Sequence, residues 1–426
     1  MASIPERDKK AVWHPFTHIK NARLPININK GEGVYLIDDK GNRYIDAFSS
    51  WWVNLHGHAH PYIAGKIYEQ AKSLEQVAFS NFTHEQAVVL AERLLKHLPG
   101  GGKVFYSDNG STAVEVALKM AIQYHHNKGK EKKKIIALEN GYHGDTFGSM
   151  SVAERNMFNL PFQSYLFDVT RIPVPVKGKE QAAMEALKKV LQGDEAGAFI
   201  FEPLVQGAGG MVMYEQGILN ELVKECNKHN CITIADEVMT GFGRTGRFFA
   251  CDYMEERPCI TCLSKGITGG FMPLGATVCT EDIYNAYLSD DKTKTFYHGH
   301  SYTANPLACA AANASLDLLE KTDTQKQIEM IAGFFENLKK EFENHTALTS
   351  CRNRGAILAL ELKTGAETNY LNPASERLTE FYLKRGIIVR PLGNILYFIP
   401  PYCIHEKELE EIETVTKELL DLWPNV

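Results

Sequence analysis

Two residues of this chain, Lys265 and Asp236, have the type and setting to do chemistry on a ligand. Lys265 follows an apolar run and precedes glycines in "LSKGITGG". Burial lowers the pKa of such a lysine and makes its neutral amine available for Schiff-base chemistry. Asp236 closes the apolar run "CITIAD", and a carboxylate there can hold the protonated ring nitrogen of a pyridine cofactor. A surface lysine and an aspartate that caps a turn are the alternatives.

The segment "SDNGSTAVEVALK" combines the end of a strand, a turn at Gly110 and Ser111, and the start of a helix. The first backbone N–H groups of a helix have no partner within it, and the helix dipole favours negative charge at this end. A phosphate suits such a turn. The alternative is that Ser111 caps the helix, and both can hold together.

Aromatic residues stand on two glycine-rich loops. Tyr142 lies in "ENGYHGDTFG", straight after an apolar run, and could stack on an aromatic cofactor or pack beneath its own loop. Trp51 and Trp52 are two of only four tryptophans, and they adjoin in "SSWWVNLHGHAHP". Because tryptophan carries a large apolar area, the pair indicates either core packing or the wall of a ligand site.

A framework of strands and helices must position these residues. From about residue 60 to 330, short apolar runs alternate with amphipathic segments, and residues 111–126 carry apolar side chains at helical spacing. This pattern indicates an α/β fold with a mostly parallel sheet covered by helices on both faces. Ligands bind at the carboxyl ends of the strands in such sheets. The predicted strands are residues 103–107, 134–138, 197–203, 231–238, and those of "ITCLSK" and "LGATVCT".

The two ends of the chain predict a smaller α/β domain beside the large one. Residues 1–58 contain a hairpin, in which "GVYLID" and "RYIDAF" flank a turn. Residues 59–330 form the large domain. Residues 331–426 form the smaller one, with strands "AILALEL", "GIIVR" and "ILYFIP" between helices, and we expect it to pack with the N-terminal hairpin.

Composition argues against several classes of function. The 426 residues are 44% hydrophobic, and their net charge of −6 is not concentrated in blocks, which favours neither nucleic acid nor a membrane surface as a partner. We find no secretory signal and no run of the roughly 18–20 apolar residues that span a membrane, and we expect a cytoplasmic protein.

Cysteines and histidines do not indicate a metal site. The nine cysteines are irregularly spaced and several fall in apolar runs, as expected of reduced core residues. Cys259 and Cys262 form a C-x-x-C pair without a second pair at zinc spacing, so we assign them no metal or redox role. The histidines of "HGHAH" (56–60) lack nearby acidic or cysteine ligands, and loop packing is the better interpretation.

The chain resembles the class III (omega) aminotransferases of the fold-type I superfamily over nearly its whole length. The resemblance implies pyridoxal 5'-phosphate as cofactor. Three further segments, "WHPFT", "SSWW" and "VRPLGNILYFIPPY", are similar to the branch of the family that makes 7,8-diaminononanoate from 8-amino-7-oxononanoate in biotin synthesis, with S-adenosylmethionine or lysine as amino donor. The family motifs are "DNGSTAVEVALKMA", "GYHGDTFGSMS", "EPLVQGAGGM", "ADEVMTGFGRTG", "LSKGITGG" and "NPLACAAANASL".

This resemblance implies roles around the cofactor. Lys265 would form a Schiff base with it and would then move a proton between substrate and cofactor. Asp236 would bind the pyridine nitrogen, Gly110 and Ser111 would hold the phosphate, and Tyr142 would stack near the ring.

It also implies a homodimer with two active sites at the interface. The segment "HGHSYT" would enter the site of the other subunit. There Gly299 would lie near the substrate, and His300 and Ser301 near the phosphate.

The substrate residues follow in the same way. Arg390 matches the arginine that binds the substrate carboxylate, since an anionic tail needs a fixed cation. Arg244 matches a second active-site arginine. Trp51 would line the tunnel for the aliphatic chain, with Trp52 and Tyr397 close by.

Two positions depart from the best-known members. Phe16 stands where they have Tyr in "HPYT", which removes a hydroxyl expected near the substrate amine. His300 and Ser301 replace Pro and Thr of "HGPT", although Ser301 keeps a hydroxyl. We hypothesise that Phe16 marks a shifted donor preference. Alternatives are a class III enzyme acting on another omega-amino acid or a diamine, and a catalytically silent cofactor-binding protein, which Lys265 and Asp236 argue against.

Overall fold

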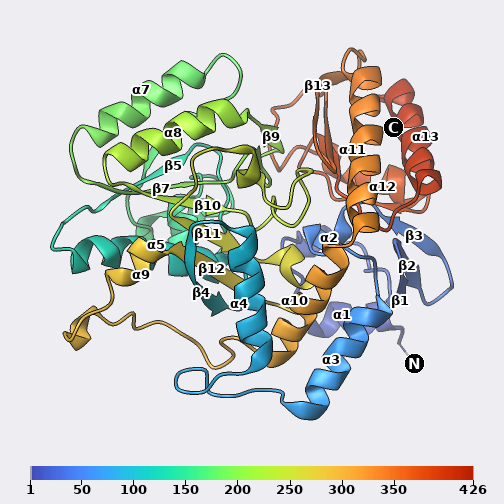
Figure 1. Ribbon diagram of the computed structural model, residues 1–426. Helices are drawn as coiled ribbons and strands as arrows, with labels where there is room; N and C mark the ends of the chain where they lie inside the picture. Colours follow the sequence, from blue (N-terminus) through green and yellow to red (C-terminus); the bar gives the residue numbers. More distant parts are fainter. Residues whose placement is uncertain (1, 426) are drawn as a thin grey trace.

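The computed structural model describes residues 2–425. A seven-stranded sheet in the order β4-β12-β11-β10-β7-β5-β6 forms its centre (Figure 1). Neighbouring strands from β11 to β6 are parallel, whereas β12 is antiparallel to both β11 and β4. The strands are β4 (Gly101–Ser107), β5 (Lys134–Leu138), β6 (Thr170–Ile172), β7 (Ala196–Phe201), β10 (Ile232–Asp236), β11 (Ile260–Leu263) and β12 (Gly275–Thr280).

Helices cover both faces of this sheet because its strands are apolar on both sides. In β7, Phe199 packs in a cluster with α7 (Glu180–Leu191) and α8 (Gln216–Lys228). The next residue, Ile200, packs on the other face with α5 (Gly110–Asn127). Successive side chains of a strand point to opposite faces, so the continuous apolar run "AGAFIF" packs against helices on both faces of the sheet.

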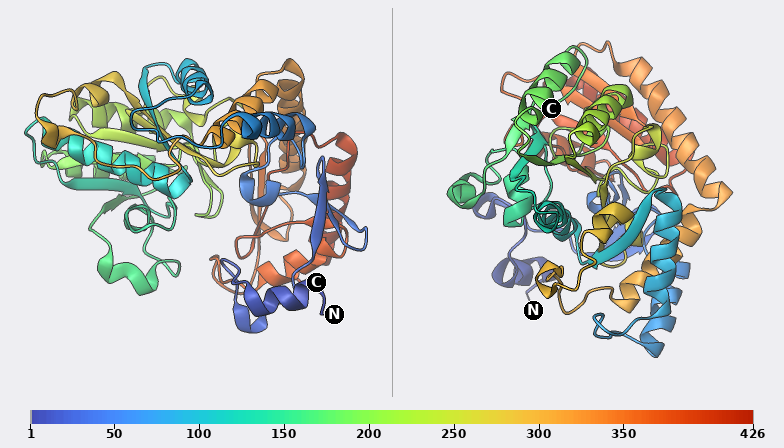
Figure 2. Two further views of the ribbon diagram at one scale, coloured as in Figure 1. Left: turned by 90° about the horizontal axis from the view of Figure 1, so that it is seen from below. Right: turned by 60° about the vertical axis from the view of Figure 1, so that its left-hand side comes forward.

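The two ends of the chain meet in a second unit, where the N-terminal strands and the C-terminal helices lie side by side (Figure 2). Ile387 and Ile388 of β15 pair in parallel with β3, which extends the N-terminal hairpin to the sheet β1-β2-β3-β15. A three-stranded sheet, β13-β14-β16, lies in the same unit. Its elements are β1 (Ile28–Glu32), β2 (Tyr35–Asp38), β3 (Arg43–Asp46), β13 (Leu348–Arg354), β14 (Ile357–Leu362), β15 (Ile387–Ile388), β16 (Ile395–Phe398), α11 (Thr322–Phe342), α12 (Ala374–Leu383) and α13 (Glu406–Leu422).

Shorter elements connect and flank the two units. The helix α10 packs against both α3 and α4, under the central sheet in the view of Figure 1. These elements are α1 (Ile4–Ala11), α2 (Ser49–Trp52), α3 (Pro61–Ser73), α4 (Glu85–His97), α6 (Phe147–Val152), β8 (Val205–Gln206), β9 (Val212–Met213), α9 (Glu281–Asn285) and α10 (Pro306–Leu319).

The structure confirms the expected α/β fold and differs from the sequence prediction in two details. First, β12 is antiparallel, because residues 264–274 return from β11 without the helical crossover that a parallel neighbour needs. Second, α11 spans residue 330, where the sequence analysis places a domain boundary, so the chain enters the C-terminal unit along one continuous helix.

The histidine-rich loop "HGHAH" packs as expected. His56 lies 3.0 Å from the Ser315 hydroxyl, and His58 lies 2.9 Å from Asp46. Within residues 2–425, no group of three or more His, Cys, Asp and Glu side chains is arranged to hold a metal ion. Over the same residues all nine cysteines are free, as expected of reduced core thiols.

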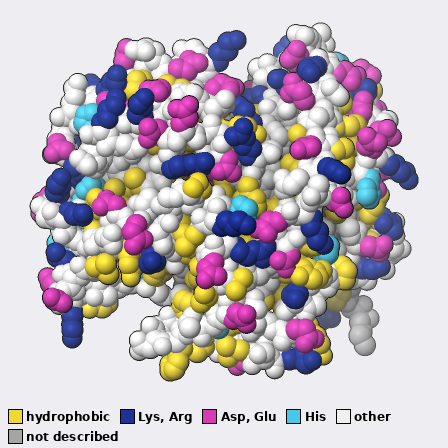
Figure 3. All heavy atoms as spheres, viewed as in Figure 1, with side chains coloured by type: hydrophobic (Ala, Val, Ile, Leu, Met, Phe, Trp, Pro, Cys, Tyr) yellow, Lys and Arg dark blue, Asp and Glu magenta, His cyan; other side chains and the backbone are white. Residues whose placement is uncertain are grey.

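The surface carries both signs of charge. Figure 3 shows basic and acidic side chains interspersed over one face, with hydrophobic side chains gathered in its lower half. Among the described helices, none combines the length and hydropathy needed to cross a bilayer.

Candidate active site

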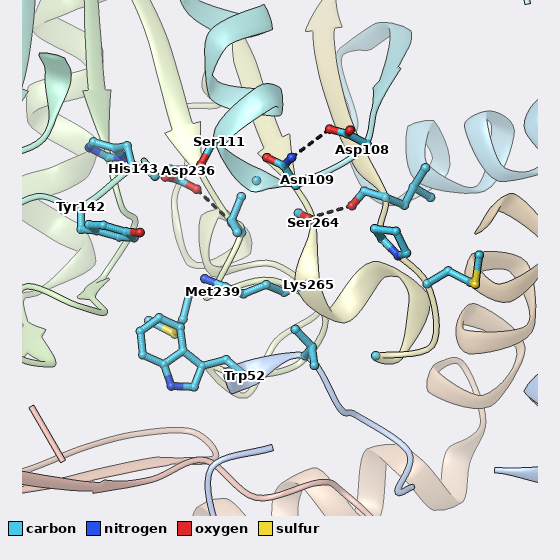
Figure 4. Close-up of a pocket in the computed structure, with 18 of the residues that line it drawn as sticks. Trp52, Asp108, Asn109, Ser111, Tyr142, His143, Asp236, Met239, Ser264 and Lys265 are labelled. Carbon is cyan, nitrogen blue, oxygen red and sulfur yellow. Dashed lines mark hydrogen bonds and ion pairs between the residues drawn. The ribbon is translucent and has the colours of Figure 1, made fainter. Parts of the chain in front are cut away.

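A cavity of about 480 Å³ lies at the carboxyl ends of the central strands. β4, β5, β7, β10 and β11 run in one direction, so the residues that follow them meet at one edge. Figure 4 shows Lys265 in the middle of this cavity, with Asp236 above it, Trp52 below and Tyr142 to the left. The structure thus brings together four of the residues that the sequence analysis selected.

Lys265 enters the cavity from the turn after β11. Its backbone is left-handed, with φ of 47°, which is uncommon for a residue with a Cβ. The Nζ atom lies 4.5 Å from the ring centroid of Trp52. Burial lowers the pKa of this amine, although the charges of Asp236 and Glu202 oppose the shift. A lysine in this state is a nucleophile and a proton carrier.

Asp236, at the end of β10, is paired with a buried histidine. Its Oδ2 lies 2.7 Å from Nδ1 of His143, and its Oδ1 accepts a hydrogen bond from the backbone N–H of Val238 at 3.1 Å. Burial lowers the pKa of His143, but the hydrogen bond and charge of Asp236 outweigh it and raise the pKa above its ordinary value. The pair therefore holds the Asp236 carboxylate in place beside the cavity.

Glu202, which follows β7, ties two loops of the site together. Its carboxylate accepts hydrogen bonds from the backbone N–H of Tyr142 at 3.1 Å and of Gly207 at 2.8 Å. Burial raises the pKa of Glu202 to about 7. Burial also raises the pKa of the Tyr142 phenol, so this ring is neutral near pH 7.

The start of α5 provides an anion site. Asn109, not Ser111, caps the helix, because its side chain accepts the N–H of Thr112 at 3.0 Å. Within the described chain the N–H groups of Gly110 and Ser111 have no acceptor. A Cβ on Gly110 would lie 2.8 Å from Val238, so the glycine is required for this close packing. The N-capping interpretation of Ser111 is therefore wrong, and its hydroxyl faces the cavity.

A second cavity of about 290 Å³, here called the tunnel, adjoins the first. Trp52, Val53, Tyr142 and Lys265 line both cavities, so the lysine amine stands at the junction. The remaining residues of the tunnel are mainly aromatic, as suits an aliphatic ligand. They are Phe16, Trp51, Phe158, Ala208, Tyr370, Arg390, Leu392 and Tyr397.

The segment "SSWW" is a left-handed turn, which places both tryptophans at the tunnel. Its four residues have φ of 55°, 46°, 74° and 72°, and each such residue costs roughly 1–3 kcal/mol. Ser49 donates a hydrogen bond to the carbonyl of Ile399 at 2.6 Å, which helps to hold the turn. Trp52 Nε1 donates to the Tyr397 hydroxyl at 3.1 Å.

Arg390 lines the tunnel and not the first cavity. Its guanidinium carbon lies 4.1 Å from the ring centroid of Trp51, and its Nη2 donates to the Tyr370 hydroxyl at 3.2 Å. Among residues 2–425 no carboxylate pairs with it, whereas Arg352 pairs with Glu361 at 3.0 Å. Arg390 is thus a fixed cation with free donors.

Arg244 does not line either cavity, in contrast to the expectation from the resemblance. It is fully buried, and its guanidinium donates to three backbone carbonyls: Pro400 at 2.8 Å, Trp52 at 3.3 Å and Asn54 at 2.9 Å. Its role in the structure is to clamp the loop that carries the two tryptophans.

The segment Gly299–Ser301 lies outside both cavities. Ser301 accepts a hydrogen bond from Gln76 through its carbonyl at 2.6 Å. Its expected position in the site of another subunit stays a prediction.

Sequence reasoning missed four residues of the site. His143 and Glu202 lie within motifs that the sequence analysis quotes, "GYHGDTFGSMS" and "EPLVQGAGGM", so their types and positions after predicted strands could have indicated them. Phe158 and Tyr370 lie in irregular loops with no recognisable pattern, and only the fold brings them to the tunnel.

The sequence pattern of the class III aminotransferases matches residues 17–420, and the chain belongs to this family. An adenosylmethionine-8-amino-7-oxononanoate aminotransferase from Synechococcus elongatus is 47% identical over 419 residues, which cover 96% of this chain and 98% of the relative. The crystal structure of the enzyme of the same name from Methanocaldococcus jannaschii matches with a TM-score of 0.91 at 36% identity, over 97% of this chain and 98% of that one. The crystal structure of an omega transaminase from Pseudomonas jessenii in complex with PMP matches with a TM-score of 0.91 at 27% identity, over 99% of this chain and 98% of that one.

Family membership confirms the expectation of an aminotransferase that uses pyridoxal phosphate. The residues of the first cavity fit that cofactor. Free N–H groups at the start of α5 suit its phosphate, and the carboxylate of Asp236 suits its ring nitrogen. The Lys265 amine, which makes no hydrogen bond within residues 2–425, suits its carbonyl carbon.

Proposed function

We propose that this enzyme transfers an amino group to 8-amino-7-oxononanoate and forms 7,8-diaminononanoate, as the names of its relatives suggest. The tunnel carries the proposal. It has the Lys265 amine where it adjoins the first cavity, aromatic walls, and, in the part of its wall that the first cavity does not share, the Arg390 guanidinium, which no described carboxylate neutralises. A substrate with a carbonyl near one end and a carboxylate at the other matches these two groups.

Each residue has a separate task. Pyridoxal phosphate, when bound, supplies the electron sink for amino transfer. Lys265 would carry the proton between the substrate carbon and the cofactor, because its amine lies at the junction of the two cavities. Asp236, held in place by His143, would bind the protonated ring nitrogen. Tyr142 and Trp52 would exclude water on either side of the amine.

We further infer a homodimer in which Gly299–Ser301 completes the site of the other subunit. Exposed aromatic side chains near this segment support the inference: Tyr297 is 72% exposed, Tyr302 66% and Phe82 64%. Clusters of this kind mark association surfaces. A mixture of Lys265→Ala and Ser301→Glu, each inactive alone, should regain activity through hybrid dimers. A mixture that stays inactive while the subunits exchange would contradict shared sites.

The amino donor is the open part of the proposal. Phe16 packs edge-on against Trp51, with 5.5 Å between ring centroids, and lines the tunnel. The tyrosine hydroxyl that Phe16 lacks would therefore belong to the tunnel wall. We propose that this loss shifts the donor preference away from S-adenosylmethionine, toward lysine. A donor screen in which only S-adenosylmethionine supports turnover would refute the shift.

A half-reaction tests the acceptor. The purified holoenzyme is mixed with 7,8-diaminononanoate in the absence of any acceptor, and the visible absorbance of the bound cofactor is followed. We expect the band to bleach and 8-amino-7-oxononanoate to appear. If simple omega-amines bleach the band and 7,8-diaminononanoate does not, the chemistry holds and the substrate is wrong.

A further inference from the structure

Tyr370 lines the tunnel beside Arg390. It belongs to residues 363–373, which connect β14 to α12. This connection lies against the turn before β16, where a Cβ on Gly393 would come within 1.8 Å of the Asn369 carbonyl. Because only glycine allows that approach, the turn fixes the backbone next to Tyr370.

Its ring is held by other aromatic residues. The centroids of Tyr370 and Phe158 are 4.8 Å apart in an edge arrangement. Phe158 in turn packs against Phe16 at 5.9 Å and against Tyr142 at 6.3 Å. A chain of rings therefore connects Tyr370 to the residues around the Lys265 amine, and its position is set relative to the reacting end of the tunnel.

The hydroxyl of Tyr370 has an unused hydrogen. A guanidinium only donates, so in the 3.2 Å contact with Arg390 Nη2 the phenol oxygen is the acceptor. Nowhere in the described part of the chain does the Tyr370 hydroxyl find an acceptor of its own. The same contact is the one hydrogen bond that the Arg390 guanidinium makes within residues 2–425. A phenol and a guanidinium thus lie side by side in the wall of the tunnel, both with free hydrogens.

We propose that Tyr370 is a specificity-determining residue that binds the distal carboxylate of the acceptor together with Arg390. Arg390 supplies the charge, and the Tyr370 hydroxyl supplies a second, directional donor whose place the arginine fixes. The inference rests on the proposed function, in that it needs an acceptor with a terminal carboxylate. Hydrogen bonds from a phenol to a carboxylate are among the strong ones, since the acceptor is charged.

The test compares the holoenzyme with Tyr370→Phe, which keeps the ring and removes only the hydroxyl. Steady-state kinetics are measured with 8-amino-7-oxononanoate and with its methyl ester. We expect KM for the acid to rise about ten-fold or more in the variant, with kcat changed less than about two-fold, and KM for the ester to stay the same. Tyr165→Phe, at a side chain 77% exposed, is the matched control.

A merely structural role predicts a different result. If Tyr370→Phe raises KM equally for acid and ester, or leaves both unchanged, the proposal is wrong. Combination with Arg390→Ala should be less than additive for the acid, because both residues act on one carboxylate. If the wild type turns over neither the acid nor its ester, the proposed function fails. The half-reaction is then measured with 6-aminohexanoate, which has a terminal carboxylate, and with hexylamine, which has none. The same acid-selective loss there supports Tyr370, and its absence overturns it.

Discussion

The variant Arg244→Lys tests whether Arg244 supports the framework of the protein or acts in the active site. The guanidinium donates to three backbone carbonyls and lies with its carbon 5.1 Å from the Tyr402 ring centroid, all in the interior. A lysine keeps the charge, but its single nitrogen cannot occupy the positions of both Nη1 and Nη2. It therefore loses either the bond from Nη1 to Pro400 or the two bonds from Nη2 to Trp52 and Asn54. Bonds to charged groups contribute about 1.5–3 kcal/mol each, so the loss of one or two costs about 1.5–6 kcal/mol. That is a large part of the stability of an ordinary domain.

Urea unfolding at one protein concentration gives the first measurement, and amino transfer gives the second. We expect the free energy of unfolding to fall by about 1.5–6 kcal/mol. We also expect a lower kcat/KM, because the loop from Trp52 to Asn54 is released. Arg247→Lys is the matched control. Arg247 lies in the same segment of the chain as Arg244, is exposed, and donates one hydrogen bond, to the carbonyl of Asp252. It should change stability by less than about 1 kcal/mol.

A variant Arg244→Lys of wild-type stability but without activity would refute this reasoning. Such a result would indicate that Arg244 acts in the active site, as the family resemblance implies.

Three further outcomes are expected. Trp51→Ala removes the ring beneath Arg390 and should lower kcat/KM for 8-amino-7-oxononanoate about 2- to 30-fold in steady-state assays, since a cation–π contact contributes about 0.5–2 kcal/mol. Glu202 has a pKa of about 7 in the folded state against about 4.5 unfolded, so it binds more protons when folded. Relative to Glu202→Gln, the wild type should therefore lose stability in urea unfolding as pH rises from about 5 to about 8. Phe16→Tyr should raise turnover with S-adenosylmethionine relative to lysine in a donor screen.

Each of these has a result that contradicts it. For Trp51→Ala it is unchanged turnover with an intact circular dichroism spectrum. For Glu202→Gln it is a stability difference from wild type that does not vary with pH. For Phe16→Tyr it is a donor ratio equal to that of the wild type.

The sequence predicted the parts of the site that depend on local pattern. Lys265, Asp236 and Gly110 each follow an apolar run that forms a strand, and strands of one direction end at one edge, so their meeting could be expected. The hairpin of β2 and β3 was likewise predictable from its turn residues.

Other parts depend on contacts between distant segments. Arg244 looks like a site residue in sequence, but its carbonyl partners lie 156, 192 and 190 residues away along the chain. Tyr370 and Arg390 meet because β14 pairs with β16, which brings the segment after β14 against the turn before β16. The antiparallel course of β12 has a similar cause, since the length of a connection, and not the pattern of the strand, decides its direction.

The shared wall of the two cavities has a consequence for changing the substrate range by mutation. Trp52, Val53, Tyr142 and Lys265 face cofactor and substrate at once, so a substitution that widens the tunnel there also alters how firmly the cofactor is retained. Phe158 belongs to the tunnel alone. A library directed at Phe158 and its tunnel neighbours can therefore explore bulkier amines without loss of holoenzyme, whereas one directed at the shared wall selects for two properties together.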